Sequence, residues 1–354
     1  MKNIPKKTVR VFAALISILL IASVTFMAGA CKTTVSENVT TTEISVTEVS
    51  NDSQKPSGET EAEQAASTTE DATIKITDGL GNEIILEKPA EKVIVFTPSA
   101  LEIVDALNAM DKVAGVDSWS IDSKEPLAEG FEGFGDFQSL NIEKIAAADP
   151  DLIMGLVGWT ETDLQKLTDL GIKMYITDAN TIDEVYTEIL NMGVIFDKIS
   201  EAEILKKNLE KQVEEIKTKL SGLEDTDKPK VFYEVWNDPL MSAGNDTFIN
   251  DLIKTAGGIN IVASDGLSGW PEYSIENLVQ NNPNVIIAPV SLAADADVIL
   301  TDSRFSTVDA VINKRVYIVP DNPLTRPNQN IIKGLEMIAK ALHPDIFGEF
   351  EIIE

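Results

Sequence analysis

The sequence feature that most constrains the fold is a short segment that occurs twice. Residues 141–153 and 274–286 share Asn or Ser, then Ile-Glu, then a Pro two positions before an apolar pair, all at the same spacing. In each copy the Asn or Ser can cap a short helix, the Glu lies in its first turn, and the Pro ends it before a buried strand. The repeat predicts two similar lobes with Glu143 and Glu276 at equivalent points, although each Glu could simply complement its helix dipole.

Short β-branched runs alternate with helical patterns, which predicts an α/β fold with parallel sheets covered by helices. The candidate strands are 93–97, 113–116, 152–154 and 174–176 in a first set, and 231–235, 285–288 and 316–319 in a second. Ser99 and Glu102 form a candidate capping box for a helix over about 100–109. Thr247 can cap a helix that ends at Gly257 and Gly258.

An amphipathic helix is predicted between the two strand sets. Apolar residues recur there every three or four positions among Lys and Glu, at Leu205, Leu209, Val213, Ile216 and Leu220. This helix could be another layer of a single domain, but its position favours a bridge. We therefore expect an N-terminal lobe over 73–180, bridging helices over 181–229 and a C-terminal lobe over 230–354.

The first 31 residues have the layout of a signal peptide. Basic residues precede an uncharged run of 17 residues over 11–27 and then small residues. A transmembrane anchor is the alternative, and the run is at the short end for that role. Cys31 stands where cleavage would expose it, and the stretch resembles a bacterial lipobox, with Ala28 where Leu is usual. The resemblance implies lipidation of Cys31 and anchoring to the extracytoplasmic face of the cell membrane.

Composition indicates a disordered tether and narrows the classes of function. Residues 32–72 hold 15 Ser or Thr and nine acidic residues without an aromatic one, so they cannot bury enough apolar surface to order themselves.

The whole chain has a formal net charge of −29, which excludes a nucleic-acid partner. One Cys and one His exclude an internal disulfide and a Cys-rich or His-rich metal site.

No catalytic constellation is found, so the sequence predicts a protein that is not an enzyme. The nucleophile elbow, the phosphate loop and the dinucleotide fingerprint are all missing. His343 precedes Pro344 at a predicted helix end, where a polar cap is ordinary. We expect no cofactor and no metal.

Aromatic residues instead point to ligand binding. Each of the four tryptophans follows a candidate strand or lies in a turn: Trp119, Trp159, Trp236 and Trp270. In open parallel sheets, ligands bind beyond the carboxyl ends of the strands. Each indole could alternatively anchor a loop in the core, but all four together favour the edge of a cleft for a large flat ligand.

Motifs over about 73–347 resemble the cobalamin and iron-siderophore class of ABC-transporter binding proteins. They are Thr77-Asp78-Gly79-Leu80-Gly81-Asn82, Val93-Ile94-Val95 with Pro98 and Glu102, Arg315-Val316-Tyr317, Arg326-Pro327, Gly334-Leu335-Glu336 and Leu342-His343-Pro344. The resemblance implies two Rossmann-like lobes joined by one long helix, the class III periplasmic-binding-protein fold. It also implies a monomer that hands its ligand to a permease dimer whose arginines meet Glu143 and Glu276.

Within that class, the segment 231–240 with Ala243-Gly244 and Trp270-Pro271 is most similar to vitamin B12 binders. This implies a corrinoid ligand, with a ferric siderophore or haem as the alternative. The implied ligand contacts are Trp119, Phe137, Trp236 and Trp270, with Asp321 and Arg326 as polar partners and Trp159 nearby. Many members carry a second Arg where this chain has Asn330, which makes an anionic siderophore less favourable. A surface hydrolase and an adhesion lipoprotein are weaker alternatives.

Overall fold

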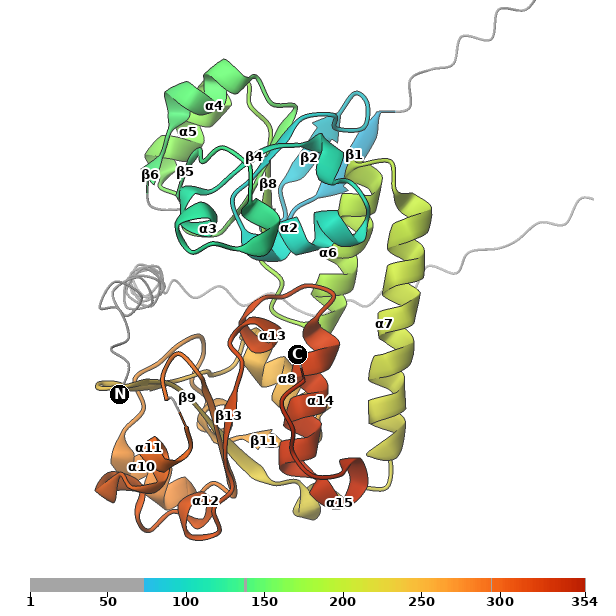
Figure 1. Cartoon of the computed structure of the whole chain (residues 1–354). Helices are drawn as coiled ribbons and strands as arrows, with labels where there is room; N and C mark the ends of the chain where they lie inside the picture. The colour runs from blue at the N-terminus through green and yellow to red at the C-terminus, as the bar shows by residue number, and fades with distance from the viewer. Residues whose placement is uncertain (1–72, 137–138, 294, 354) are drawn as a thin grey trace, which may run out of the picture.

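The computed structural model describes residues 73–136, 139–293 and 295–353. These residues form two α/β lobes, one above the other in Figure 1, with the long helix α7 along one side. This arrangement confirms the fold class expected from the sequence. The predicted signal peptide, Cys31 and the tether lie outside the described residues.

The N-terminal lobe is built on a parallel sheet with strand order β4-β3-β7-β8. Its strands are β3 (Val93–Val95), β4 (Val113–Val116), β7 (Leu152–Leu156) and β8 (Met174–Thr177). Successive residues point to opposite faces. Val93 and Val95 join an apolar cluster with helices α2 (Pro98–Ala106) and α6 (Ile182–Ile195), whereas Ile94 joins a cluster with α4 (Ile142–Ala148) and α5 (Glu161–Asp169). All four predicted strands of the first set are confirmed.

Smaller elements complete this lobe. They are the hairpin β1 (Ile74–Thr77) and β2 (Glu83–Leu86), η1 (Met110–Lys112), α3 (Ser118–Asp122), η2 (Pro126–Ala128), β5 (Gly135–Asp136) and β6 (Ser139–Leu140). The Asp78 carboxylate closes the β1–β2 turn, because its Oδ1 accepts from the backbone N–H groups of Leu80 and Asn82. This hairpin was not predicted from the sequence.

The C-terminal lobe repeats the plan around the strand order β10-β9-β12-β13, with β11 also pairing to β9. Its strands are β9 (Lys230–Asn237), β10 (Leu240–Ser242), β11 (Ile259–Asn260), β12 (Val285–Pro289) and β13 (Val316–Val319). The pairs among β9, β12 and β13 are parallel, and the three predicted strands of the second set are confirmed. Val231 and Tyr233 face one apolar cluster, and Phe232 faces another.

Helices cover both faces of the C-terminal sheet. They are α8 (Phe248–Thr255), α9 (Ile261–Ser264), α10 (Ile275–Asn281), α11 (Asp297–Leu300), η4 (Ser303–Phe305), α12 (Asp309–Ile312), α13 (Asn322–Thr325), α14 (Ile331–Leu342) and α15 (Pro344–Phe347). His343 lies between α14 and α15, at a helix end as predicted. Burial lowers the pKa of its imidazole, although hydrogen bonds to the backbone of Gly257 and Ala256 oppose this.

The predicted amphipathic helix is α7 (Ile199–Lys219), joined to the second lobe through η3 (Asp225–Asp227). Leu209, Val213 and Ile216 are buried on it, and α7 packs on α6 and α14. One apolar cluster runs from the first sheet through these helices to the second sheet. The two lobes are therefore joined by continuous packing as well as by the chain.

The helix caps explain how the duplicated segment folds. The Asn141 side chain accepts from Lys144 N–H at the start of α4, and the Ser274 side chain accepts from Asn277 N–H at the start of α10. Both helices end at a residue in the left-handed region, Asp149 at φ 48° and Asn282 at φ 47°. The two copies are therefore matching helix–strand units, as the repeat predicts.

One of the two other caps is confirmed. The Thr247 side chain accepts from Asn250 N–H at the start of α8. The capping box of Ser99 and Glu102 is wrong, because α2 begins at Pro98 and its N-cap, Thr97, makes no side-chain cap. Proline at the first helical position already has the required φ and has no N–H to satisfy.

Among the described residues, no helix combines the length and the apolar character needed to cross a membrane.

Glu188 on α6 is a buried carboxyl whose replacement should alter the pH dependence of stability. Burial, followed by the nearby Asp178, raises its pKa to about 8, although the backbone N–H of Asp178 donates to it at 2.9 Å. A carboxyl pKa that rises on folding gives stability that is full at low pH and is lost as pH rises through 8. At pH 9 the free energy of unfolding of Glu188→Gln should therefore exceed that of the parent by on the order of 2 kcal/mol. At pH 5 the difference between the two proteins should be smaller. Denaturant unfolding at both pH values measures this, and parallel pH profiles would contradict it.

Candidate functional site

The carboxyl ends of the parallel strands carry most of the residues predicted to bind ligand. Trp119 follows β4, Trp236 lies near the end of β9, and Asp321 follows β13. Trp270 lies in a segment that runs beside β10. These are the positions at which open parallel sheets place their ligands.

Trp236 and Trp270 lie on the same face of the C-terminal lobe. Met241 on β10 pairs with Trp236 on one side and bridges to Glu272 on the other, so three chain segments run side by side. Both indoles are partly buried and pack against the cluster that contains Met241 and Ala243. The structure thus brings together two indoles that are 34 positions apart in the sequence.

A β-bulge on β9 sets the direction of Trp236. Met241 pairs with Trp236, but the next residue of β10, Ser242, pairs with Glu234, so Val235 is the extra residue. A bulge interrupts the alternation of side chains and re-aims the residues beside it. As a result, the neighbouring side chains of Val235 and Trp236 contact the same apolar cluster. In a regular strand these two side chains would point to opposite faces of the sheet.

Trp119 belongs to the opposite lobe. It lies on α3, which is on the side of the N-terminal lobe that faces the C-terminal lobe (Figure 1). The buried Asp117 carboxylate fixes the start of α3, because it accepts from the backbone N–H of Ser120 at 2.7 Å and from its hydroxyl at 2.6 Å. The indole is partly exposed and is not among the side chains that pack on the three buried clusters of the described residues.

Trp159 lies in the core of the N-terminal lobe. Its side chain is 8% exposed and meets Phe96 edge to face, with ring centroids 5.4 Å apart. A Cβ on Gly155 would lie 2.2 Å from the indole, so the glycine makes room for it. Trp159 is therefore a core residue, and the ligand role predicted for it is not supported by its position. Phe137 lies outside the described residues.

Asp321 holds the loops that follow β12 and β13. Its carboxylate accepts from the Ser291 hydroxyl and, at 3.2 Å, from the Ser291 backbone N–H. Burial raises the pKa of this carboxyl, and the hydrogen bonds from Ser291 oppose the rise. The Tyr233 side chain is fully buried, and its hydroxyl has no hydrogen-bond partner among the described residues. Burial, followed by the charge of Asp321, raises the pKa of this hydroxyl.

Arg326 connects the two lobes. Its guanidinium donates through Nη1 to Glu102 at 2.8 Å, and through Nη1 and Nη2 to Glu125 at 3.0 and 2.6 Å. The three side chains are between 13% and 19% exposed, so the charges are largely shielded from water. The resemblance assigns Arg326 to the ligand, and the structure gives its guanidinium this further role between the lobes.

Three amide side chains after Arg326 extend this connection. Asn328 Nδ2 and Asn330 Nδ2 donate to Glu102 Oε2 at 2.9 and 2.8 Å, and Gln329 Nε2 donates to the Glu102 carbonyl at 3.0 Å. We call Glu102, Glu125, Arg326 and the amides of 328–330 the interlobe latch. Sequence reasoning missed it, because Glu102 looked like part of a helix cap. The signal in the sequence was the run of three amide residues at 328–330 directly after Arg326-Pro327.

Glu143 and Glu276 are both exposed and lie in the first turns of the matching helices α4 and α10. The two helices lie on different lobes, on the side of the molecule opposite α7 (Figure 1). A contact at both glutamates would therefore touch both lobes on this side.

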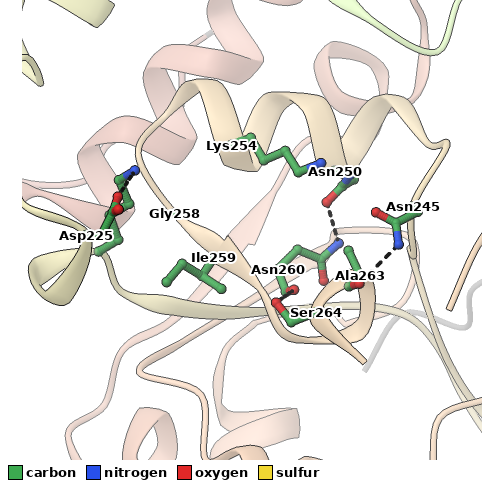
Figure 2. Close-up of a pocket in the computed structure, with 10 residues that line it drawn as sticks. Asp225, Asn245, Asn250, Lys254, Gly258, Ile259, Asn260, Ala263 and Ser264 are labelled. Carbon is green, nitrogen blue, oxygen red and sulfur yellow. Dashed lines mark hydrogen bonds and ion pairs between the residues drawn. The ribbon is translucent and has the colours of Figure 1, made fainter. Parts of the chain in front are cut away.

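A separate pocket of about 400 Å³ lies in the C-terminal lobe, between α8 and residues 258–264. Figure 2 shows Asn250 and Lys254 on α8 above Asn260 and Ser264. The ten lining residues include none of those predicted to bind ligand. Within the described part of the chain, no group of three or more His, Cys, Asp or Glu side chains is placed to hold a metal ion.

Comparison with known proteins connects this geometry to a family. The model of the periplasmic binding protein family matches residues 93–323. An uncharacterized ABC transporter substrate-binding lipoprotein of Bacillus subtilis is 29% identical over 81% of this chain and 90% of its own length. A vitamin B12-binding protein of Vibrio cholerae is 26% identical over 72% of this chain and 90% of its own.

Solved structures of similar proteins have the same fold as this chain. One from Staphylococcus epidermidis, described as a possible iron-binding, periplasmic solute-binding protein, superposes with a TM-score of 0.60 at 28% identity. It covers 72% of this chain and 99% of that one. Members of this class are extracytoplasmic, solute-binding components of ABC importers that work with a membrane permease. The chain belongs to the periplasmic binding protein family and has its class III fold.

Proposed function

We propose that this protein captures a corrinoid between its two lobes and delivers it to the permease dimer of an ABC importer. The observation that carries the proposal is the placement of the indoles, with Trp236 and Trp270 on one face of the C-terminal lobe and Trp119 on the helix of the N-terminal lobe that faces it. Flat, wide rings on two facing lobes suit a planar macrocycle.

Two further observations favour a corrinoid over an anionic iron complex. Curated relatives that span most of the folded body are named for vitamin B12 binding. The chain carries a formal net charge of −29, and Arg326 is already paired with two carboxylates. An anionic ferric siderophore would meet unfavourable charge here, whereas a corrinoid without net negative charge would not.

A ferric chelate or haem is the second candidate ligand. The Staphylococcus epidermidis neighbour, named as a possible iron-binding protein, favours it. Both candidates would bind between the same two lobes, so a binding assay separates them.

The proposal also covers how the protein is attached to the cell membrane. We propose that Cys31 is lipidated and anchors a monomer to the extracytoplasmic face of the membrane, with residues 32–72 as the tether. The relative from Bacillus subtilis is itself named a lipoprotein, which supports this. Labelling of the full chain with a radioactive fatty acid should mark the parent protein and not Cys31→Ser.

Titration of the purified protein with cyanocobalamin tests the ligand, with tryptophan fluorescence as the signal. We expect saturation at one ligand per chain, and Trp119→Ala and Trp236→Ala should each weaken binding about ten- to a hundredfold, the usual cost of losing a central aromatic contact. Trp159→Phe is the control, because this ring lies in the core, and its affinity should stay within about twofold. Binding of haem or a ferric siderophore, with no response to any corrinoid, would move the assignment to the iron branch.

A further inference from the structure

The indole of Trp236 is tied to the turn that follows it. Its Nε1 donates to the carbonyl of Asp238 at 2.9 Å, two residues along the chain. This turn joins β9 to β10, and the pairing of Asn237 with Leu240 closes it. The orientation of the ring therefore depends on the conformation of residues 236–239.

Asn237 anchors that turn to a distant part of the lobe. Its backbone carbonyl accepts from Arg304 Nη1 at 3.2 Å, and its side-chain Oδ1 accepts from Arg304 Nη2 at 2.8 Å. On the other side, its Nδ2 donates to Glu234 Oε1 at 2.9 Å. One residue of the turn is therefore held from two directions, and Arg304 supplies two of these three hydrogen bonds.

Arg304 is itself held firmly. Its Nε donates to both carboxylate oxygens of Asp302, at 3.1 and 3.0 Å, and its Nη2 donates to Asp302 Oδ2 at 2.6 Å. The next residue, Phe305, is fully buried in the second apolar cluster. A planar guanidinium can present one edge to a carboxylate and the other to the turn, and a lysine ammonium cannot do both.

We propose that Arg304 is a positioning residue for ligand binding, which acts by holding residues 236–239 so that the Trp236 indole faces the ligand. This rests on the proposed function, because Trp236 is assigned to the ligand there. Arg304 is not assigned to the ligand itself and works through Asn237. Its loss should therefore lower affinity only while Trp236 is present.

A double-mutant cycle with cyanocobalamin tests this dependence. Arg304→Ala should weaken binding about tenfold in the parent and less than about twofold when Trp236→Ala is already present, because coupled residues are not additive. Equal losses in the two backgrounds would overturn the proposal. Arg304→Lys keeps the charge without the fork and should bind as weakly as Arg304→Ala, so recovery of parental affinity would also contradict it.

Arg315→Ala is the matched control in the same lobe. The Arg315 Nη2 donates to the carbonyls of Ala341 and Leu342 at the end of α14. Its loss removes a structural guanidinium of the same kind, so it should lower thermal stability and leave affinity within about twofold. Loss of affinity equal to that of Arg304→Ala would assign the effect to general destabilisation.

A readout without ligand separates this inference from the proposed function. In a variant that keeps Trp236 alone, with Phe at the other three tryptophan positions, acrylamide quenching reports the exposure of that indole. Adding Arg304→Ala should raise the quenching constant about twofold, because the freed turn exposes the ring. Unchanged quenching would overturn the positioning role, whatever the protein binds. Increased quenching without cyanocobalamin binding to the parent would instead contradict the corrinoid assignment alone.

Discussion

Reversing the charge of Glu143 and Glu276 together, to Lys, is expected to lower cellular uptake of the ligand at least a hundredfold. The two side chains are exposed at equivalent points on the two lobes. If each meets arginines of the permease, reversal replaces two attractions with two repulsions, and like charges across an interface cost several kcal/mol. Uptake of labelled cyanocobalamin by cells that carry the variant measures the effect.

The matched control for this experiment changes charge by the same amount elsewhere. Glu203 and Glu214 are exposed on α7, on the opposite side of the molecule, and take part in none of the ion pairs of that helix. Their double replacement by Lys should leave uptake near the parental level. Both double variants should bind cyanocobalamin with parental affinity. Normal uptake by the Glu143 and Glu276 variant would rule out docking at these residues.

Glu102→Ala is expected to lower the melting temperature by about 5–10 °C. The substitution leaves Arg326 with one carboxylate instead of two and removes the acceptor of the Asn328 and Asn330 amides. Losing one partner of a shielded charge network costs about 2–4 kcal/mol, and each kcal/mol shifts the midpoint of a chain of this size by about 2–4 °C. Differential scanning calorimetry measures the shift.

Glu351→Ala provides the comparison for the latch. Glu351 pairs with Lys340, and 70% of the Glu351 side chain is accessible to water, although only 18% of the Lys340 side chain is. Exposed pairs contribute little, so its midpoint should change by no more than about 1 °C. If Glu102→Ala changed the midpoint as little as Glu351→Ala, the interlobe latch would not stabilise the arrangement of the lobes.

Local sequence patterns were sufficient to predict most of the framework. Residues that are close in the chain determine each of these local features. The features are the strands, the apolar stripe of α7 and the helix caps at Asn141, Ser274 and Thr247. Capping chemistry acts over three residues and amphipathic spacing over one helix turn, so a single sequence displays both. The repeated segment further predicted two matching lobes.

Features that depend on distant residues were not predicted. Arg326 and Glu102 are separated by 224 positions, and no local pattern identifies them as partners. The bulge at Val235 becomes visible only when β9 pairs with β10, so the direction of Trp236 could not be derived. Trp159 follows a strand as Trp119 does, but Gly155 opens space for its ring in the core. The same local position therefore gave a buried ring for Trp159 and a partly exposed ring for Trp119.

A structure of the protein with bound cyanocobalamin tests the central claim most directly. The account predicts that the corrin ring lies between the lobes, with atoms of Trp119 and of Trp236 or Trp270 within about 4.5 Å of it, the range of apolar contact. A corrinoid bound at the pocket beside Asn250 and Lys254, or on one lobe without contact to these indoles, would contradict it.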